Sequence, residues 1–120
     1  MNNTKLPPLT EATFHVLLAL SEGEKHGYGI MVEVATQTQG MVNLGPGTLY
    51  GCLKRLLEAK WISETEHAAG DQDVKSPVFE ERRRYYRLSG EGADVLKAEL
   101  ERIQAITRLP NVQRILGGQS

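Results

Sequence analysis

The chain of 120 residues has the length of one ordinary domain, enough to bury a core of its own and too short for two full domains. Its hydrophobic content of 40% and charged content of 24% are globular values and exclude a disordered or fibrous chain. The single Cys52 excludes an intrachain disulfide, and the longest apolar run near the N-terminus, residues 16–20, is far shorter than the roughly 20 residues of a membrane span. We therefore expect a cytoplasmic protein without a membrane partner.

The formal net charge of −1 differs from that of most nucleic-acid-binding domains, which are basic overall. The charge is unevenly distributed along the chain. Residues 41–62 contain 3 Lys or Arg against 1 Asp or Glu, and residues 82–120 contain 8 against 4. Residues 63–81 contain 1 against 6. Two basic segments therefore flank an acidic one, and a local positive field can attract an anion to one face of the molecule.

The N-terminal part of the sequence predicts a flexible arm and then a helix. Residues 1–9 contain two prolines and polar side chains, which favour the arm. Thr10 can cap a helix that runs to about Ser21, because a threonine hydroxyl accepts a hydrogen bond from first-turn N–H groups. The apolar side chains at helical spacing in this segment are core or interface material: Phe14, Leu17 and Leu18.

A second helix is expected from about Gly27 to Gln39, with Gly40 as its C-terminal stop. Its apolar positions recur at helical spacing and are Tyr28, Met31, Val34 and Ala35. The segment of residues 41–44, MVNL, is apolar and short, and it predicts a brief strand before the next helix.

Residues 44–57, LGPGTLYGCLKRLL, predict a third helix that ends near Lys60. Gly45 can serve as the N-cap, and Pro46 is preset for the first helical position, where a missing N–H is harmless. One face must be buried, because it carries Leu49, Leu53, Leu56 and Leu57 at helical spacing. The opposite face holds Gly47, Gly51, Lys54, Arg55 and Glu58, with Thr48 and Tyr50 on its flanks. This outer face lacks bulk near its start and carries two adjacent cations, so an anionic polymer can approach it closely.

The next segment predicts a hairpin. Residues 61–66, WISETE, alternate between two faces as a strand does, and residues 83–88, RRYYRL, are rich in aromatic side chains. Tyr85 and Tyr86 then lie on opposite faces, one in the core and one exposed. The polar residues 67–82 contain Gly70 and Pro77 and form a long loop between the two strands.

The C-terminal part predicts a long helix with an apolar seam. Ser89 can cap this helix, and Pro110 should bend or stop it. The seam approaches a heptad pattern and consists of Ala93, Leu96, Leu100, Ile103, Ile106 and Leu109. A short apolar turn is expected beyond the proline from Val112, Ile115 and Leu116.

The predicted order is three helices, a hairpin and a long helix. This order predicts a mainly α fold with a small β-hairpin, of the α+β class. Specifically, the order indicates a winged helix-turn-helix domain over residues 10–88, followed by a C-terminal helix over 89–116 and a tail over 117–120. In a winged helix-turn-helix, the third helix enters the major groove of DNA and the hairpin lies along the DNA backbone.

Three strings in this order resemble the PadR family of bacterial transcriptional regulators. They are LLALSEGEKHGYGI at 17–30, GPGTLYGCLKRLLEAKWI at 45–62 and RRYYRLSGEG at 83–92, and the match spans about residues 10–105. The middle string is the most diagnostic. The single C-terminal helix resembles the short subgroup of the family.

The resemblance implies a repressor that dimerises through its C-terminal helix, binds a roughly palindromic operator as double-stranded DNA and is released by a small-molecule effector. The dimer contacts expected on this basis are Leu96, Leu100, Ile103 and Phe14. Some short members hold flat aromatic ligands between their dimer helices with aromatic side chains. Residues 89–120 of this chain contain no Phe, Tyr or Trp, so we do not expect such an aromatic pore here.

The candidate DNA-binding residues are Thr48, Tyr50, Lys54, Arg55, Arg82 and Arg83. Hydroxyl groups near a helix N-terminus suit phosphate oxygens, and Lys or Arg can contact phosphates or guanine edges. Two alternatives stay open on the third helix. Lys54 and Arg55 can form an ordinary solvated face, and Tyr50 can be a half-buried packing residue. The run Arg82 to Arg84 can pair with the adjacent Glu80 and Glu81, although such exposed pairs contribute only about 0–1 kcal/mol.

The sequence gives little support to catalysis, a cofactor or a metal. His15, His26, His67 and Cys52 have no ligand spacing such as CxxC or HxxxH, so His26 in the string HGYG is expected to be structural and Cys52 a small buried hydrophobe. The string GPGTLYG imitates a dinucleotide fingerprint. Its glycines at 45, 47 and 51 are spaced one residue too widely for GxGxxG, and no further βαβ unit follows.

A second functional hypothesis is a winged-helix module that binds proteins and not DNA, which the net charge of −1 keeps open. Salt distinguishes the two, because DNA binding weakens steeply as salt is added. Trp61, between the third helix and the hairpin, is expected in the core, with the lining of a ligand cavity as the alternative.

Overall fold

Residues 9–66 and 84–117 are described in the structure, which is a computed structural model. The helices are α1 (Glu11–Leu20), α2 (Gly27–Gln37), α3 (Pro46–Glu58), α5 (Gly90–Thr107) and α6 (Pro110–Leu116). The strands are β1 (Lys25–His26), β2 (Ile62–Glu66) and β3 (Arg84–Leu88). Most of the predicted arm and all of the predicted loop over 67–82 lie outside the described residues. The described part confirms the expected α+β fold.

Side chains at the N-caps explain where α1 and α5 begin. The Thr10 hydroxyl accepts a hydrogen bond from the N–H of Thr13 at 3.1 Å, and the Ser89 hydroxyl accepts one from Gly92 at 3.0 Å. The predicted caps of α1 and α5 are thus confirmed. Helix α3 begins with Pro46 at its first position after Gly45, as the sequence predicts.

The sheet has three antiparallel strands in the order β1-β3-β2. Ile62 pairs with Leu88 at one end of the hairpin and Glu66 with Arg84 at the other, while Lys25 of β1 pairs with Tyr86 on the far side of β3. Both predicted hairpin strands are therefore confirmed, but β3 is the central strand of a larger sheet. Tyr86 is buried and Tyr85 is partly buried, on opposite faces of β3.

The prediction of a strand at residues 41–44 is wrong, because the short additional strand is β1, before α2. After α2, Gly40 adopts a left-handed φ of 81°, and the Thr38 hydroxyl accepts a hydrogen bond from the Val42 N–H at 3.0 Å. The Val42 N–H is therefore bonded within this turn and is not available for a hydrogen bond to a neighbouring strand. The open edge of β3 lies instead beside Lys25 and His26, so those two residues pair with it.

The core lies where α1, α2, α3, the sheet and the start of α5 meet. Its fully buried large side chains are Val16, Leu17, Ile30, Val34, Leu49, Cys52 and Leu53. Full burial of an aliphatic side chain of this size stabilises the fold by about 1.5–3 kcal/mol. Cys52 is confirmed as a small buried hydrophobe, and Trp61 packs against the same cluster.

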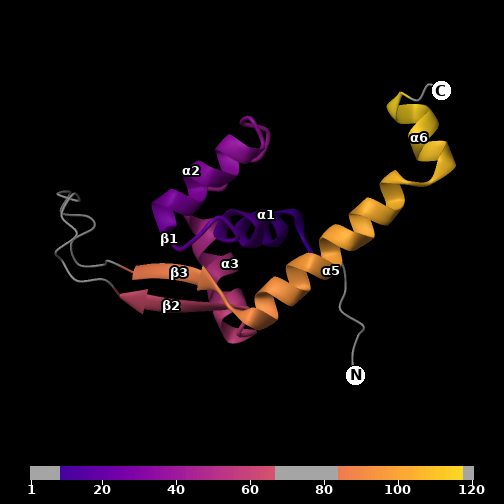
Figure 1. The fold of residues 1–120 in the computed structure, drawn as a ribbon. Coiled ribbons are helices and arrows are strands. Elements are labelled where there is room, and N and C mark those ends of the chain that lie inside the picture. Colours follow the sequence, from indigo (N-terminus) through magenta and orange to yellow (C-terminus); the bar gives the residue numbers. More distant parts are fainter. Residues whose placement is uncertain (1–8, 67–83, 118–120) are drawn as a thin grey trace.

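Helix α5 starts at the sheet and runs outward from the domain body, with α6 at its far end (Figure 1). The backbone N–H of Ser89 donates to the carbonyl of Trp61 at 3.0 Å, and the Ser89 hydroxyl donates to the carbonyl of Lys60 at 2.8 Å. These bonds fix the start of α5 against the end of α3. Pro110 separates the two C-terminal helices, and residues 110–116 form a helix where the sequence predicted only an apolar turn.

Candidate nucleic-acid interface

Helix α3 separates its side chains into a buried and an exposed face. Leu49, Leu53 and Leu56 are buried, while Leu57 is partly buried. The predicted DNA-binding side chains on the helix are all exposed and are Thr48, Tyr50, Lys54 and Arg55. Of the two glycines predicted on this outer face, Gly47 is exposed and Gly51, about one turn further on, is partly buried.

Lys54 is only loosely held in the free chain. Its ammonium lies 3.9 Å from the carboxylate of Glu58, and both side chains are largely exposed. An exposed pair of this kind contributes about 0–1 kcal/mol, so it does not compete strongly with a phosphate for the lysine.

Tyr50 combines exposure with packing. Its side chain is 50% exposed, yet the hydroxyl end of the ring reaches Gly27, the first residue of α2. The sequence left open whether Tyr50 is exposed for DNA contact or is a half-buried packing residue, and each description fits one part of this side chain. The outer part of the ring faces solvent, and the hydroxyl end contacts a neighbouring helix.

Strand β3 carries further basic side chains. Arg84 pairs with Glu64 of the neighbouring strand at 3.0 Å, and Arg87 on the same strand is exposed. The predicted contacts Arg82 and Arg83 lie outside the described residues. Arg84 is thus the first described cation of the predicted arginine run, and it is partly occupied by an acidic partner.

Tyr86 is a buried tyrosine on the central strand of the sheet, and its surroundings raise its pKa. Burial raises the pKa of its phenol above 10.0, and the nearby Glu64 and Tyr50 raise it further, while Arg84 lowers it. Tyr86 therefore stays neutral at physiological pH.

The predicted dimer residues occupy three different environments. Leu96 is 4% exposed and belongs to the core of its own chain, where it anchors α5 to the domain body. Phe14 is partly buried against the same core. Leu100 and Ile103 are about 40% exposed, and the seam continues in the exposed Ile106 and Leu109. The side chains free to meet another surface therefore lie on the outer part of α5, beyond Leu96.

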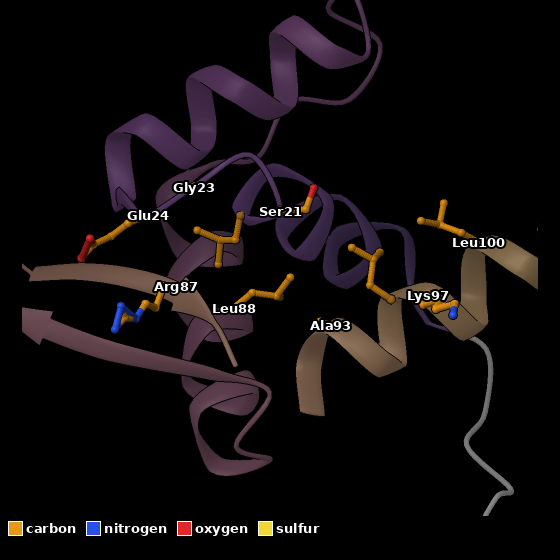
Figure 2. A pocket seen from close by; sticks show the side chains of 10 residues that line it. Ser21, Gly23, Glu24, Arg87, Leu88, Ala93, Lys97 and Leu100 are labelled. Atoms are coloured by element: carbon orange, nitrogen blue, oxygen red, sulfur yellow. The ribbon is translucent and has the colours of Figure 1, made fainter. Parts of the chain in front are cut away.

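A groove of about 560 Å³ lies at the junction of α1, β3 and α5. Its apolar part is formed by Leu20, Leu88, Ala93, Leu96 and Leu100. Figure 2 shows Glu24 and Arg87 at the sheet end of this groove and Lys97 at the α5 end. Trp61 is not among its lining residues, which agrees with the prediction that this side chain belongs to the core.

The histidine of the string HGYG has a structural task. Nδ1 of His26 accepts a hydrogen bond from the N–H of Gly29 at 3.0 Å and caps α2, and the ring meets Tyr85 edge-on at 5.3 Å. The prediction of a structural histidine is confirmed. Across residues 9–66 and 84–117, no group of three or more His, Cys, Asp or Glu is arranged to hold a metal ion. His67 lies outside the described residues.

The arrangement is that of a winged helix-turn-helix protein, in which α2 and α3 form the helix-turn-helix and β2 and β3 form the wing. The model of the transcriptional regulator PadR-like family matches residues 16–98, and the chain belongs to this family. It is therefore a DNA-binding transcriptional regulator, from a family that is in general not enzymatic. The resemblance noted in the sequence is confirmed.

Solved structures agree with this assignment. A PadR family transcription regulator from Clostridium difficile R20291 is 25% identical, with a TM-score of 0.66 over 90% of this chain and 100% of that one. A transcriptional regulator from Clostridium thermocellum is also 25% identical, with a TM-score of 0.65 over 84% and 89% of the two chains. A PadR-like regulator from Bacillus cereus shares the fold at 21% identity, with a TM-score of 0.66 over 89% and 92%. No curated protein matches the sequence.

Within the described part of the chain, none of the helices has the length and apolar character needed to cross a membrane.

Sequence reasoning missed one residue of this interface. Gly27 was treated only as the start of a helix, and its contact with Tyr50 joins positions 23 residues apart in the chain. The string HGYG pointed to a special local structure, but no local pattern identifies the partner of the glycine.

Proposed function

We propose that the protein is a dimeric, cytoplasmic repressor that binds a palindromic operator in double-stranded DNA through α3 and its wing. The observation that carries this proposal is the exposed face of α3, where Thr48, Tyr50, Lys54 and Arg55 stand on a helix whose other face is buried in the core. A helix held in this way can enter a major groove without unfolding any part of the domain.

The residues of α3 take different tasks in this proposal. Thr48 lies in the first turn, where a hydroxyl and the free N–H groups of the helix start suit a phosphate oxygen. Lys54 and Arg55 lie two turns further on, where long cationic side chains contact phosphates or guanine edges. Arg82 and Arg83, which precede β3 in the sequence, contact the DNA backbone in this proposal.

The exposed seam of α5 supports a dimer. Leu100, Ile103 and Ile106 are apolar and exposed on a helix that leaves the domain body (Figure 1). Two copies joined there by twofold symmetry present two α3 helices. Binding to successive major grooves on one side of DNA requires them to lie roughly 34 Å apart, and a palindromic site matches that symmetry.

Release by a small molecule is the remaining part of the proposal. The groove between α1, β3 and α5 has a volume within the range of about 300–1,000 Å³ that is common for ligand pockets. A ligand there would contact both the DNA-binding domain and α5. It would shift the separation of the two α3 helices by binding one arrangement more tightly than the other.

A mobility-shift titration on the DNA upstream of the protein's own gene tests the proposal. Wild-type chain should shift this fragment, and Lys54→Ala and Arg55→Ala should each weaken binding, by about 1–3 kcal/mol where the side chain contacts a base. If Lys54 contacts a phosphate, its removal should also reduce the slope of log affinity against log salt by about 1.

Lys97→Ala is a matched control for Lys54→Ala. Lys97 also forms an i,i+4 pair with a glutamate at 3.9 Å and is equally exposed, but it lies on α5. It should leave DNA affinity almost unchanged. Absence of any shift at low salt, on this or any other fragment, would contradict DNA binding and favour the protein-interaction module.

A further inference from the structure

Gly27 is a buried glycine whose missing side chain makes room for Tyr50. A Cβ atom placed on Gly27 would lie 2.9 Å from Cζ of Tyr50 and closer still to the hydroxyl oxygen. Real side chains do not tolerate such a distance. The absence of a Cβ at Gly27 therefore forms a slot at the start of α2, and the hydroxyl end of Tyr50 occupies it.

A capping hydrogen bond and a strand pairing, both made by His26, hold the start of α2, where this slot lies. His26 caps α2 directly before Gly27, through its bond from the N–H of Gly29, and also pairs with Tyr85 in the sheet. The start of α2 is thus tied to β3. The slot at Gly27 that receives Tyr50 therefore has a fixed position relative to the sheet.

The rest of the Tyr50 ring belongs to the exposed face of α3 that we propose to meet DNA. Tyr50 stands two residues after Thr48 and four before Lys54, and half of its surface is open to solvent. A ring whose hydroxyl end already occupies a slot has fewer orientations to lose when it contacts DNA, so its binding costs less conformational entropy.

We propose that Gly27 is a positioning residue for DNA recognition, which holds Tyr50 in the orientation that faces the operator through the slot it leaves at the start of α2. This inference rests on the proposed binding of DNA by α3. Gly27 itself does not contact the DNA. It acts through Tyr50, so its effect depends on the presence of that side chain.

The contact predicts what Gly27→Ala would change. The atoms that obstruct a new Cβ are at the far end of the Tyr50 side chain, which can rotate away without moving any backbone. The variant should therefore fold, with the Tyr50 ring displaced into solvent.

Gly29→Ala is the matched control, because it makes the same change two residues along the same helix. A Cβ on Gly29 would lie 3.5 Å from the His26 ring, an ordinary contact distance. The experiment measures DNA affinity by fluorescence anisotropy, on the fragment that the wild-type chain binds, for four variants: Gly27→Ala, Gly29→Ala, Tyr50→Ala and the double variant Gly27→Ala with Tyr50→Ala. Thermal unfolding of each variant is recorded in parallel.

We expect Gly27→Ala to weaken DNA binding at least about fivefold, which corresponds to about 1 kcal/mol, and Gly29→Ala to bind as the wild type does. In the Tyr50→Ala background, the Gly27 substitution should have no further effect on affinity. If Gly27→Ala lowers the unfolding temperature, removal of Tyr50 in the double variant should restore it.

Three results would overturn the inference. Wild-type affinity in Gly27→Ala would show that the slot does not serve DNA binding, and the proposed function would stand. An equal loss in the presence and absence of Tyr50 would show that Gly27 acts through something else. A wild-type chain that binds no DNA would remove the proposed function and this inference together.

Discussion

Single side chains determine where the helices of this domain begin and how they face one another. Thr10, His26 and Ser89 each accept a hydrogen bond from an N–H in the first turn of the following helix. Loss of such a cap typically costs about 0.5–2 kcal/mol. Ser89 has further tasks, because its hydroxyl and N–H bind the end of the α3 segment. One residue thus joins the segment that follows α3 to the start of α5.

A pH dependence of stability is expected at the scale of one residue, Tyr86. Burial and the nearby Glu64 raise the pKa of its phenol in the folded chain above the 10.0 of the unfolded chain. The contribution of the neutral phenol to stability is therefore fully present below pH 10.0 and is lost as the pH rises through the folded-state pKa. Urea unfolding at neutral pH and above pH 10.0 should show a lower midpoint in alkali.

Tyr86→Phe is the control for this prediction, because it keeps the buried ring and removes the titrating group. The variant should lose less stability between the two pH values than the wild type does. An identical loss in both proteins would assign the alkaline effect to other tyrosines or lysines.

At the scale of elements, the position of α5 depends on close contact with the end of the α3 segment. A Cβ on the buried Gly92 would lie 2.8 Å from the carbonyl carbon of Trp61 and closer still to its oxygen. Both are backbone atoms, which cannot rotate away. The first turn of α5 can therefore approach the α3–β2 connection this closely only with glycine at position 92.

Gly92→Ala should lower the free energy of unfolding by about 1–3 kcal/mol, as overpacking in a rigid site does. Gly90→Ala is the matched control, since it lies two residues earlier in the same helix and a Cβ there meets nothing within 4 Å. It should leave stability unchanged or slightly higher. Denaturant unfolding of both variants makes the comparison, and equal midpoints would contradict the packing argument.

Helix α3 and the position of β1 show what can be predicted for an element. The face of α3 followed from the spacing of its leucines, which is a property of one helix. The strand at 41–44 was predicted from composition alone, and composition does not specify a partner. Strand pairing requires an available edge, and β3 offers its free edge to Lys25 and His26, about 60 residues away in the chain.

At the scale of the whole molecule, the outer half of α5 carries apolar side chains that its own domain does not cover. Leu96 packs into the core, while Ile103 and Ile106 further along the helix are 39% and 46% exposed. The molecule measures 54 Å along its longest axis, and α5 extends away from the body toward α6 (Figure 1). An arm of this kind is suited to join two copies, as the proposed function requires.

The double variant Ile103→Glu with Ile106→Glu should be a monomer by light scattering, because charges at the proposed dimer seam oppose its burial. Its unfolding should otherwise remain cooperative, since neither side chain belongs to the core. Affinity for a palindromic fragment should fall, because a single domain contacts only one half-site. Ala98→Glu, at an exposed position on another side of α5, should remain dimeric. A dimeric seam variant would place the interface elsewhere.

The sequence by itself determined the local structure of this protein: the capped starts of α1 and α5, the two faces of α3, the hairpin strands and the break at Pro110. Capping and apolar periodicity act between residues a few positions apart, so the sequence displays them directly. The tertiary structure decided which strand completes the sheet, that Leu96 belongs to the core and that Tyr50 lies in the slot of Gly27. Each of these depends on contacts between segments far apart in the chain, which only the folded backbone brings together.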